Sequence, residues 1–124
     1  MLLFVALGGA LGAVGRYLTV AGVGAVTGLA FPFGTLVVNV VGSFILGALV
    51  ESAALAWSPS QELRAMLVVG VLGAYTTFST FSLDVVLQLE RGNFGGAAIY
   101  ILSSVTLCVL ALYGGMRLMR LVLT

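Results

Sequence analysis

This chain of 124 residues contains no histidine, one cysteine, two prolines and only nine charged residues, five basic and four acidic. About a quarter of the residues of soluble domains are charged, whereas the fraction here is 7%. Hydrophobic residues make up 61% of the chain, and the mean hydropathy is +1.25. These values exclude an ordinary soluble domain and predict an integral membrane protein. Cys108 has no partner for a disulfide within the chain, so cysteine usage does not indicate a redox compartment.

The sequence also lacks the residue groups that most catalytic sites use. It has no histidine, no pair of carboxylates at helical spacing within an apolar segment, no glycine-rich phosphate loop and no cluster of metal-ligating side chains. We therefore expect no enzymatic activity, and we expect no nucleic-acid partner.

Long apolar segments are abundant, and they predict four helices that span a lipid bilayer. A spanning helix needs about 20 mainly apolar residues. Such segments cover residues 2–24, 34–57, 65–89 and 94–112, and the last continues to Arg117 and Arg120. No soluble domain fits beside them, so residues 1–124 are expected to form a single all-α transmembrane domain. No Lys or Arg precedes the first apolar run, which favours a retained helix over a secretion signal.

Three short connections separate the predicted spans. Pro32 and its flanking glycines indicate a turn, and Trp57 suits a membrane interface. Ser58 or Ser60 can cap a helix that restarts near residue 60, and ERGN at residues 90–93 supplies a charged turn. Four spans place both termini on the same side of the membrane.

The arginines give almost no preference for one orientation in the membrane. The side that holds both termini carries Arg64, Arg117 and Arg120, and the other side carries Arg91, together with Arg16 if its side chain extends that way. Three arginines on one side and two on the other are compatible with insertion of the chain in both orientations. A small asymmetry that still sets one topology is an equally weighted alternative.

Two predicted helices carry polar residues at every fourth position. The second span has Thr35, Asn39 and Ser43, and such spacing keeps them on one slowly winding face. The fourth span has a matching series, which is Tyr100, Ser104 and Cys108. Isolated hydroxyls in membrane helices mostly form helix contacts or bond to their own backbone. Two facing stripes, one with an amide at mid-membrane, favour a polar path instead.

The third span contains the most unusual stretch, GAYTTFSTFSLD at residues 73–84. Glycines and hydroxyl side chains weaken a helix, so we expect a break near residues 73–77. Within a bilayer a break is tolerated only where protein, water or an ion satisfies the freed backbone groups. Phe78 and Phe81 are three residues apart and project from one face of the following helix. Lipid contact or core packing is the commoner role of such residues, but here hydroxyls flank them.

These mid-membrane groups suit an anion. They are hydroxyls, one amide and aromatic edges, which carry partial positive charge, and no Lys or Arg lies at the centre. Uncharged donors can replace the water of an anion without holding it too tightly.

Three motifs together resemble the Fluc, or CrcB, family of microbial fluoride channels. They are GGALGAVGRY at residues 8–17, GTLVVNVVGSFILG at 34–47 and GAYTTFSTFSLD at 73–84. The resemblance covers the whole chain in length, number of spans and order of motifs. It implies a homodimer of two antiparallel chains of dual topology in the cell membrane, with two fluoride pores and a structural Na⁺ at the centre. The implied role is passive export of fluoride that enters cells as HF.

The resemblance also implies roles for individual residues. The ring edges of Phe78 and Phe81 would face fluoride, with Asn39 as the pore asparagine. The main-chain carbonyls of Gly73 and Thr76 would bind Na⁺. The other residues implied to line the pore are Thr35, Ser43, Thr80, Tyr100, Ser104 and Cys108. A hydroxyl is expected where Cys108 stands, and a thiol is a weaker donor.

Two other functions are compatible with a short chain of four spans. A proton-coupled small multidrug transporter is expected to need an acid in its first helix, and none lies between Met1 and Ala30. The acids within the spans, Glu51 and Asp84, lie near predicted helix ends. An accessory subunit of a larger complex would conduct no ion by itself.

Overall fold

The computed structural model describes all 124 residues as an all-helical bundle without strands. Four helical segments are long and apolar enough to cross a membrane, as the sequence predicts. They are α1 (Leu2–Thr27), α2 (Phe33–Leu55), a third span that comprises several elements, and α6 (Phe94–Leu123). The third span runs through α3 (Gln61–Arg64), η1 (Ala65–Leu72), α4 (Gly73–Tyr75) and α5 (Phe78–Glu90).

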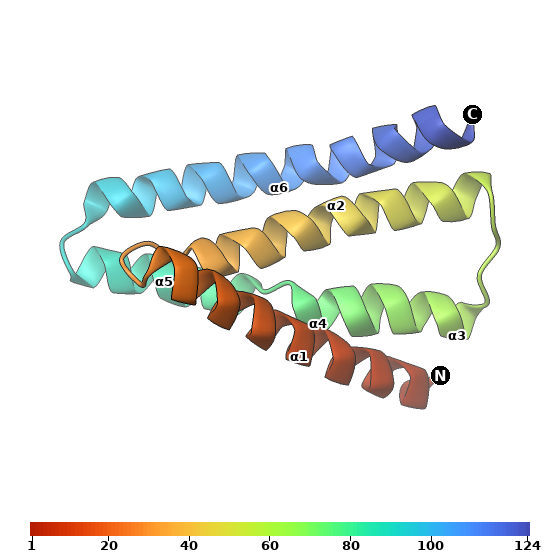
Figure 1. The fold of residues 1–124 in the computed structure, drawn as a ribbon, viewed down its shortest axis with the longest axis horizontal. Coiled ribbons are helices and arrows are strands. Elements are labelled where there is room, and N and C mark those ends of the chain that lie inside the picture. Colours follow the sequence, from red (N-terminus) through yellow and green to blue (C-terminus); the bar gives the residue numbers. More distant parts are fainter.

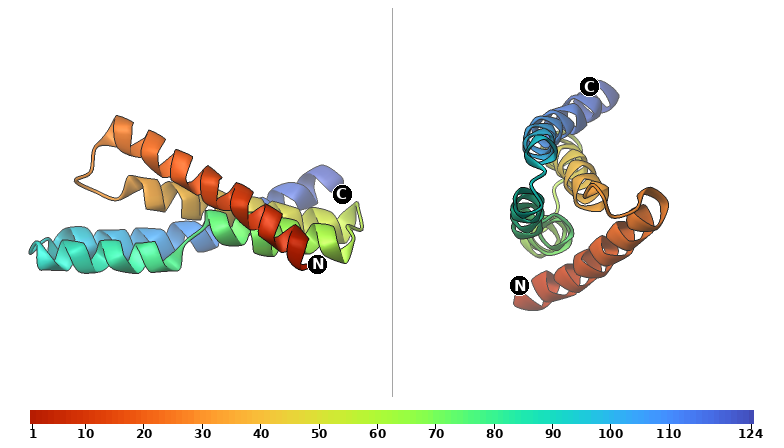
Figure 2. Two further views of the ribbon diagram at one scale, coloured as in Figure 1. Left: turned by 90° about the horizontal axis from the view of Figure 1, so that it is seen from below. Right: turned by 90° about the vertical axis from the view of Figure 1, so that its left-hand side faces the viewer.

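The two termini lie at the same end of the bundle, together with the connection between α2 and α3 (Figure 1). The α1–α2 and α5–α6 connections lie at the opposite end. α2 packs along α6, whereas α1 crosses the bundle obliquely and packs mainly on η1, α2 and α4 (Figure 2). The arrangement agrees with the four-span topology that the sequence predicts.

Local signals in the sequence explain where the helices begin and end. Ser60 caps α3, because its side chain accepts a hydrogen bond from the backbone N–H of Leu63 at 3.1 Å. Asn93 caps α6 in the same way, through the N–H of Gly96 at 3.0 Å. Gly28 ends α1 with a φ of 78°, a left-handed conformation that glycine adopts without strain.

Close helix contacts depend on glycines that face a neighbouring backbone. A Cβ atom at Gly12 would overlap the carbonyl oxygen of Val71 in η1. A Cβ atom at Gly47 would likewise overlap Leu112 O, and one at Gly115 would overlap Phe44 O. Helices in a bilayer gain little from burying apolar surface, so small residues that permit close packing are what hold them together. The Gly47 and Gly115 contacts fix α2 against α6.

The third span breaks at Thr76 and Thr77, which confirms the expected break. Thr76 has φ −86° and ψ 157°, and Thr77 has φ −154° and ψ 119°, so both residues are extended. The break lies at the end of the predicted interval, because Gly73 still belongs to α4. The span before it winds as a π-helix over Ala65–Leu72. Nothing in the sequence indicated this wider helix. The π-helix is rare in proteins, and where it occurs it is often found at a functional site.

Candidate functional site

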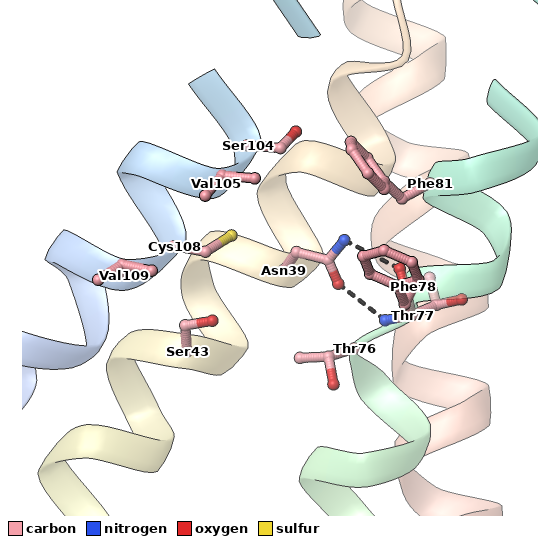
Figure 3. Close-up of a pocket in the computed structure, with 10 residues that line it drawn as sticks. All are labelled: Asn39, Ser43, Thr76, Thr77, Phe78, Phe81, Ser104, Val105, Cys108 and Val109. Carbon is pink, nitrogen blue, oxygen red and sulfur yellow. Dashed lines mark hydrogen bonds between the residues drawn. The ribbon is translucent and has the colours of Figure 1, made fainter. Parts of the chain in front are cut away.

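Asn39 of α2 satisfies the backbone that the break exposes. Its Nδ2 donates to the carbonyl of Thr77 at 3.0 Å, and its Oδ1 accepts from the N–H of Thr77 at 2.7 Å (Figure 3). The hydroxyl of Thr77 accepts from the N–H of Thr80 at 3.2 Å and thereby caps α5. One amide thus replaces the two helical hydrogen bonds that the extended conformation forfeits, and its second Nδ2 hydrogen has no partner in the chain.

A groove of about 340 Å³ opens on the surface beside this clasp. Its walls come from α2, the break, the start of α5 and the middle of α6 (Figure 3). Its lining residues are Asn39, Ser43, Thr76, Thr77, Phe78, Phe81, Ser104, Val105, Cys108 and Val109. The lining combines apolar side chains with hydroxyls, an amide and a thiol, and it contains no carboxylate or guanidinium, so its polar groups carry no full charge.

The two phenylalanines of the motif have different surroundings. Their ring centroids lie 5.4 Å apart, with the planes tilted by 50°. Phe81 is only 8% exposed and also stacks against Tyr100 at 5.0 Å, whereas Phe78 is 77% exposed. Phe81 is therefore held in place by the bundle, and Phe78 projects from the chain beside the groove.

The two polar stripes do not line one continuous cavity within a single chain. Tyr100 is fully buried behind Phe81, and its hydroxyl donates to Asp84 Oδ2 at 2.9 Å. Thr35 and Thr80 line a separate hollow of about 220 Å³ at the α1–α2 end of the bundle, which we call the mouth cavity. They also border a third hollow, between α1 and α5, that includes Arg16. Of the predicted pore residues, Tyr100, Thr35 and Thr80 thus lie apart from the groove.

Two residues of the mouth cavity were not predicted from the sequence. Gln88 of α5 and Arg91, which directly follows α5, line it together with Asp84. Gln88 is 1% exposed, and neither atom of its amide has a hydrogen-bond partner. Its position four residues after Asp84 places both on one face of α5, a spacing that could have marked it as inward-facing.

Glu51 and Asp84, the two carboxylates that the sequence places within the spans, are both engaged by a partner. Glu51 is buried and accepts from Arg120 Nε at 3.0 Å, which joins α2 to α6 near the C-terminus. Asp84 accepts from the hydroxyl of Tyr100. Neither carboxylate lines the groove, which is a poor arrangement for a central proton-carrying acid.

Four apolar spans, a broken third span and a groove at the break that carries polar but uncharged groups define a multi-pass membrane protein with the features of an ion channel. The family described as "CrcB-like protein, Camphor Resistance (CrcB)" matches residues 3–116. The chain belongs to this family, and it is a multi-pass protein of the cell membrane.

Several relatives match along almost their whole length. The protein of Rhodospirillum centenum is 54% identical over 120 residues, which cover 97% of this chain and 95% of the relative. A relative from Chelativorans is 52% identical over 122 residues, which cover 98% of both chains. The Geobacter sulfurreducens relative is 46% identical over 119 residues, or 96% of each chain. All three carry the name "Fluoride-specific ion channel FluC". The family supports the ion-channel hypothesis over a small multidrug transporter, and ion channels are not enzymes.

Proposed function

We propose that this chain forms a fluoride-selective channel that lets fluoride leave the cell passively. The observation that carries the proposal is the groove at the helix break, which combines uncharged donors with two aromatic side chains. Relatives with about half of their residues identical are named as fluoride channels.

The groove offers an anion several weak contacts in place of its water. Asn39 has a free Nδ2 hydrogen, and the hydroxyl of Ser104 is buried without a partner. The edges of the Phe78 and Phe81 rings carry partial positive charge. No group in the groove carries a full charge, so fluoride can be desolvated there and still depart.

The pore needs a second chain, because the groove lies open on the surface of one chain and Phe78 stands 77% exposed beside it. We infer an antiparallel homodimer of dual topology that closes two such grooves. The distribution of arginines supports inversion. Arg64, Arg117 and Arg120 belong to the end with both termini, while Arg91 lies at the other end and Arg16 in the middle of α1. With so small a bias, either orientation inserts at similar cost.

We further propose that a structural Na⁺ binds the backbone at the break. No side chain donates a hydrogen bond to the carbonyl of Gly73 or Thr76. None of the backbone hydrogen bonds in turns, loops and helix caps reaches either carbonyl. Gly73 is exposed on the surface of the chain, where an inverted partner would bring its own copy. Carbonyl oxygens suit a hard cation. Bound Na⁺ would supply positive charge between carbonyl dipoles that otherwise repel one another.

Fluoride efflux from liposomes, compared with chloride efflux, tests the proposed function. Phe81→Ile and Phe78→Ile each remove a polarised ring edge while roughly preserving bulk, so fluoride efflux is expected to collapse in both. Phe94→Ile is the matched control, since Phe94 is 68% exposed and lies outside the groove. Fluoride efflux at the parent rate in both groove variants would show that the two phenylalanines serve only in packing. A chain that conducts neither anion would support the accessory-subunit alternative.

Thiol labelling tests the inverted dimer. Glu90→Cys, made in a Cys108→Ser background, places one exposed cysteine at the α5–α6 turn without disturbing the Asn93 cap. An impermeant thiol reagent is expected to label this cysteine from both faces of the membrane. Labelling from a single face contradicts dual topology.

Thermal unfolding tests the cation. The purified protein is expected to unfold at a higher temperature in Na⁺ than in an organic cation at equal ionic strength, because a ligand that binds only the folded state stabilises it. Equal unfolding temperatures would count against a Na⁺ site.

A further inference from the structure

The only cysteine of the chain lies in the wall of the groove. Cys108 is partly buried on α6, one helical turn after Ser104, and its thiol points toward α2 (Figure 3). Ser43 and Asn39 of α2 line the same groove. The thiol therefore lies at a groove that these polar residues line together with Val105 and Val109.

A second observation, an unpaired polar atom in the same wall, points to a ligand. Ser104 is 6% exposed, and its Oγ has no hydrogen-bond partner. Hydroxyls in membrane helices commonly bond back to their own backbone, as Ser103 does with Ile99 O at 2.6 Å. A buried donor without a partner costs free energy, so its position at the groove indicates that a bound species pairs with it. Cys108 lies one turn farther along the same wall.

We propose that Cys108 is a modification site for small neutral thiol-reactive electrophiles, and that its modification closes the anion path. The proposal rests on the proposed function. With an alkyl thiosulfonate, the thiolate of Cys108 attacks the sulfenyl sulfur and a sulfur–sulfur bond forms. The alkylsulfinate departs as the thiosulfonate bond breaks, and the thiol proton passes to solvent. No net oxidant beyond the thiosulfonate is needed.

Modification changes both the size and the chemistry of the groove wall. The thiol is a weak donor, and the mixed disulfide is no donor at all. The added alkylthio group extends toward Ser43 and Asn39 across the groove. Fluoride would lose one contact and part of its space at the same position. A positively charged reagent is unsuitable as a probe, because it would be disfavoured in a path that selects anions.

The test uses methyl methanethiosulfonate on the intact protein in liposomes. Fluoride efflux is measured before treatment, after treatment, and again after reduction with dithiothreitol. Mass spectrometry of the same samples counts modified cysteines. Treatment is expected to lower fluoride efflux about tenfold or more, and reduction is expected to restore it. Each protein is compared with its own untreated rate.

Two variants supply controls. Cys108→Ser has no thiol, so treatment is expected to leave its own rate unchanged. The Cys108→Ser, Glu90→Cys protein carries a reactive thiol outside the groove, so it is expected to be modified without loss of efflux.

Three outcomes would overturn the proposal. They are full modification of Cys108 with efflux retained, no modification in the assembled protein under conditions that modify the unfolded chain, and equal loss of efflux in Cys108→Ser. In all three the untreated protein still conducts fluoride, so the proposed function stands. An untreated protein that does not conduct fluoride refutes the proposed function and this inference with it.

Discussion

Removing the amide of Asn39 should destabilise the protein much more than removing another asparagine that bonds to backbone. Asn39→Ala deletes both hydrogen bonds to Thr77, at 2.7 and 3.0 Å, and leaves a backbone N–H and a carbonyl without partners within the membrane. Each buried group left unsatisfied costs about 1–3 kcal/mol, so the pair predicts a loss of roughly 2–6 kcal/mol. Thr77 forms no backbone hydrogen bond that could replace them.

Asn93→Ala is the matched control. Asn93 also accepts from a backbone N–H, that of Gly96 at 3.0 Å, but it is exposed and caps the start of α6. Loss of such a cap costs about 0.5–2 kcal/mol. Reversible unfolding of the parent and both variants, in mixed micelles at one protein concentration, gives the two free-energy differences. Equal losses for the two alanine variants would refute the reasoning, because the break would then not depend on the amide.

Asn39→Asp separates the structural role of the amide from its role toward the anion. The carboxylate still accepts from the N–H of Thr77, but it cannot donate to the carbonyl, and it adds a negative charge to the groove. Fluoride efflux at neutral pH is expected to stop even in protein that remains folded, because the charge repels the anion. Efflux at the parent rate would show that Asn39 serves only as a clasp for the break.

Two further predictions concern packing and burial. Gly115→Ala should lower the unfolding free energy by about 1–3 kcal/mol, because the added Cβ would overlap Phe44 O. Gly114→Ala is the control and should be nearly neutral, since no neighbouring atom lies within 4 Å of its added Cβ. Equal losses of unfolding free energy in the two variants would contradict this α2–α6 contact. Gln88→Leu should leave stability unchanged or raise it, because both atoms of the buried amide lack partners. A marked loss of stability would show instead that a ligand in the mouth cavity satisfies Gln88.

Much of the fold could be predicted because membrane helices follow local rules. Each span needs a long apolar segment, and the turns carry their own signals at Pro32, Ser60 and Asn93. The break in the third span was also predictable, because glycines and hydroxyl residues lie together between Gly70 and Ser82. The π-helix over Ala65–Leu72 was not, since its apolar residues suit an α-helix equally well.

The residue types of the candidate site came from the sequence, but their grouping did not. Helical spacing placed Thr35, Asn39 and Ser43 on one face of α2, and that face suggested one continuous path. In the folded chain Asn39 and Ser43 line the groove, whereas Thr35 lines the mouth cavity. Phe81 and Tyr100 lie between them, and only the packing of α5 against α6 brings those two rings together.

The sequence by itself determined that the chain lies in a membrane, that it crosses four times and that its third helix breaks, because hydropathy and helix propensity act over neighbouring residues. The pairing of Asn39 with Thr77, 38 positions away, depends on how α2 meets the break, and so does the exposure of Phe78 beside the groove. Such contacts arise where separate helices approach. Their approach depends on backbone contacts such as those of Gly47 and Gly115, which no local pattern of residues specifies.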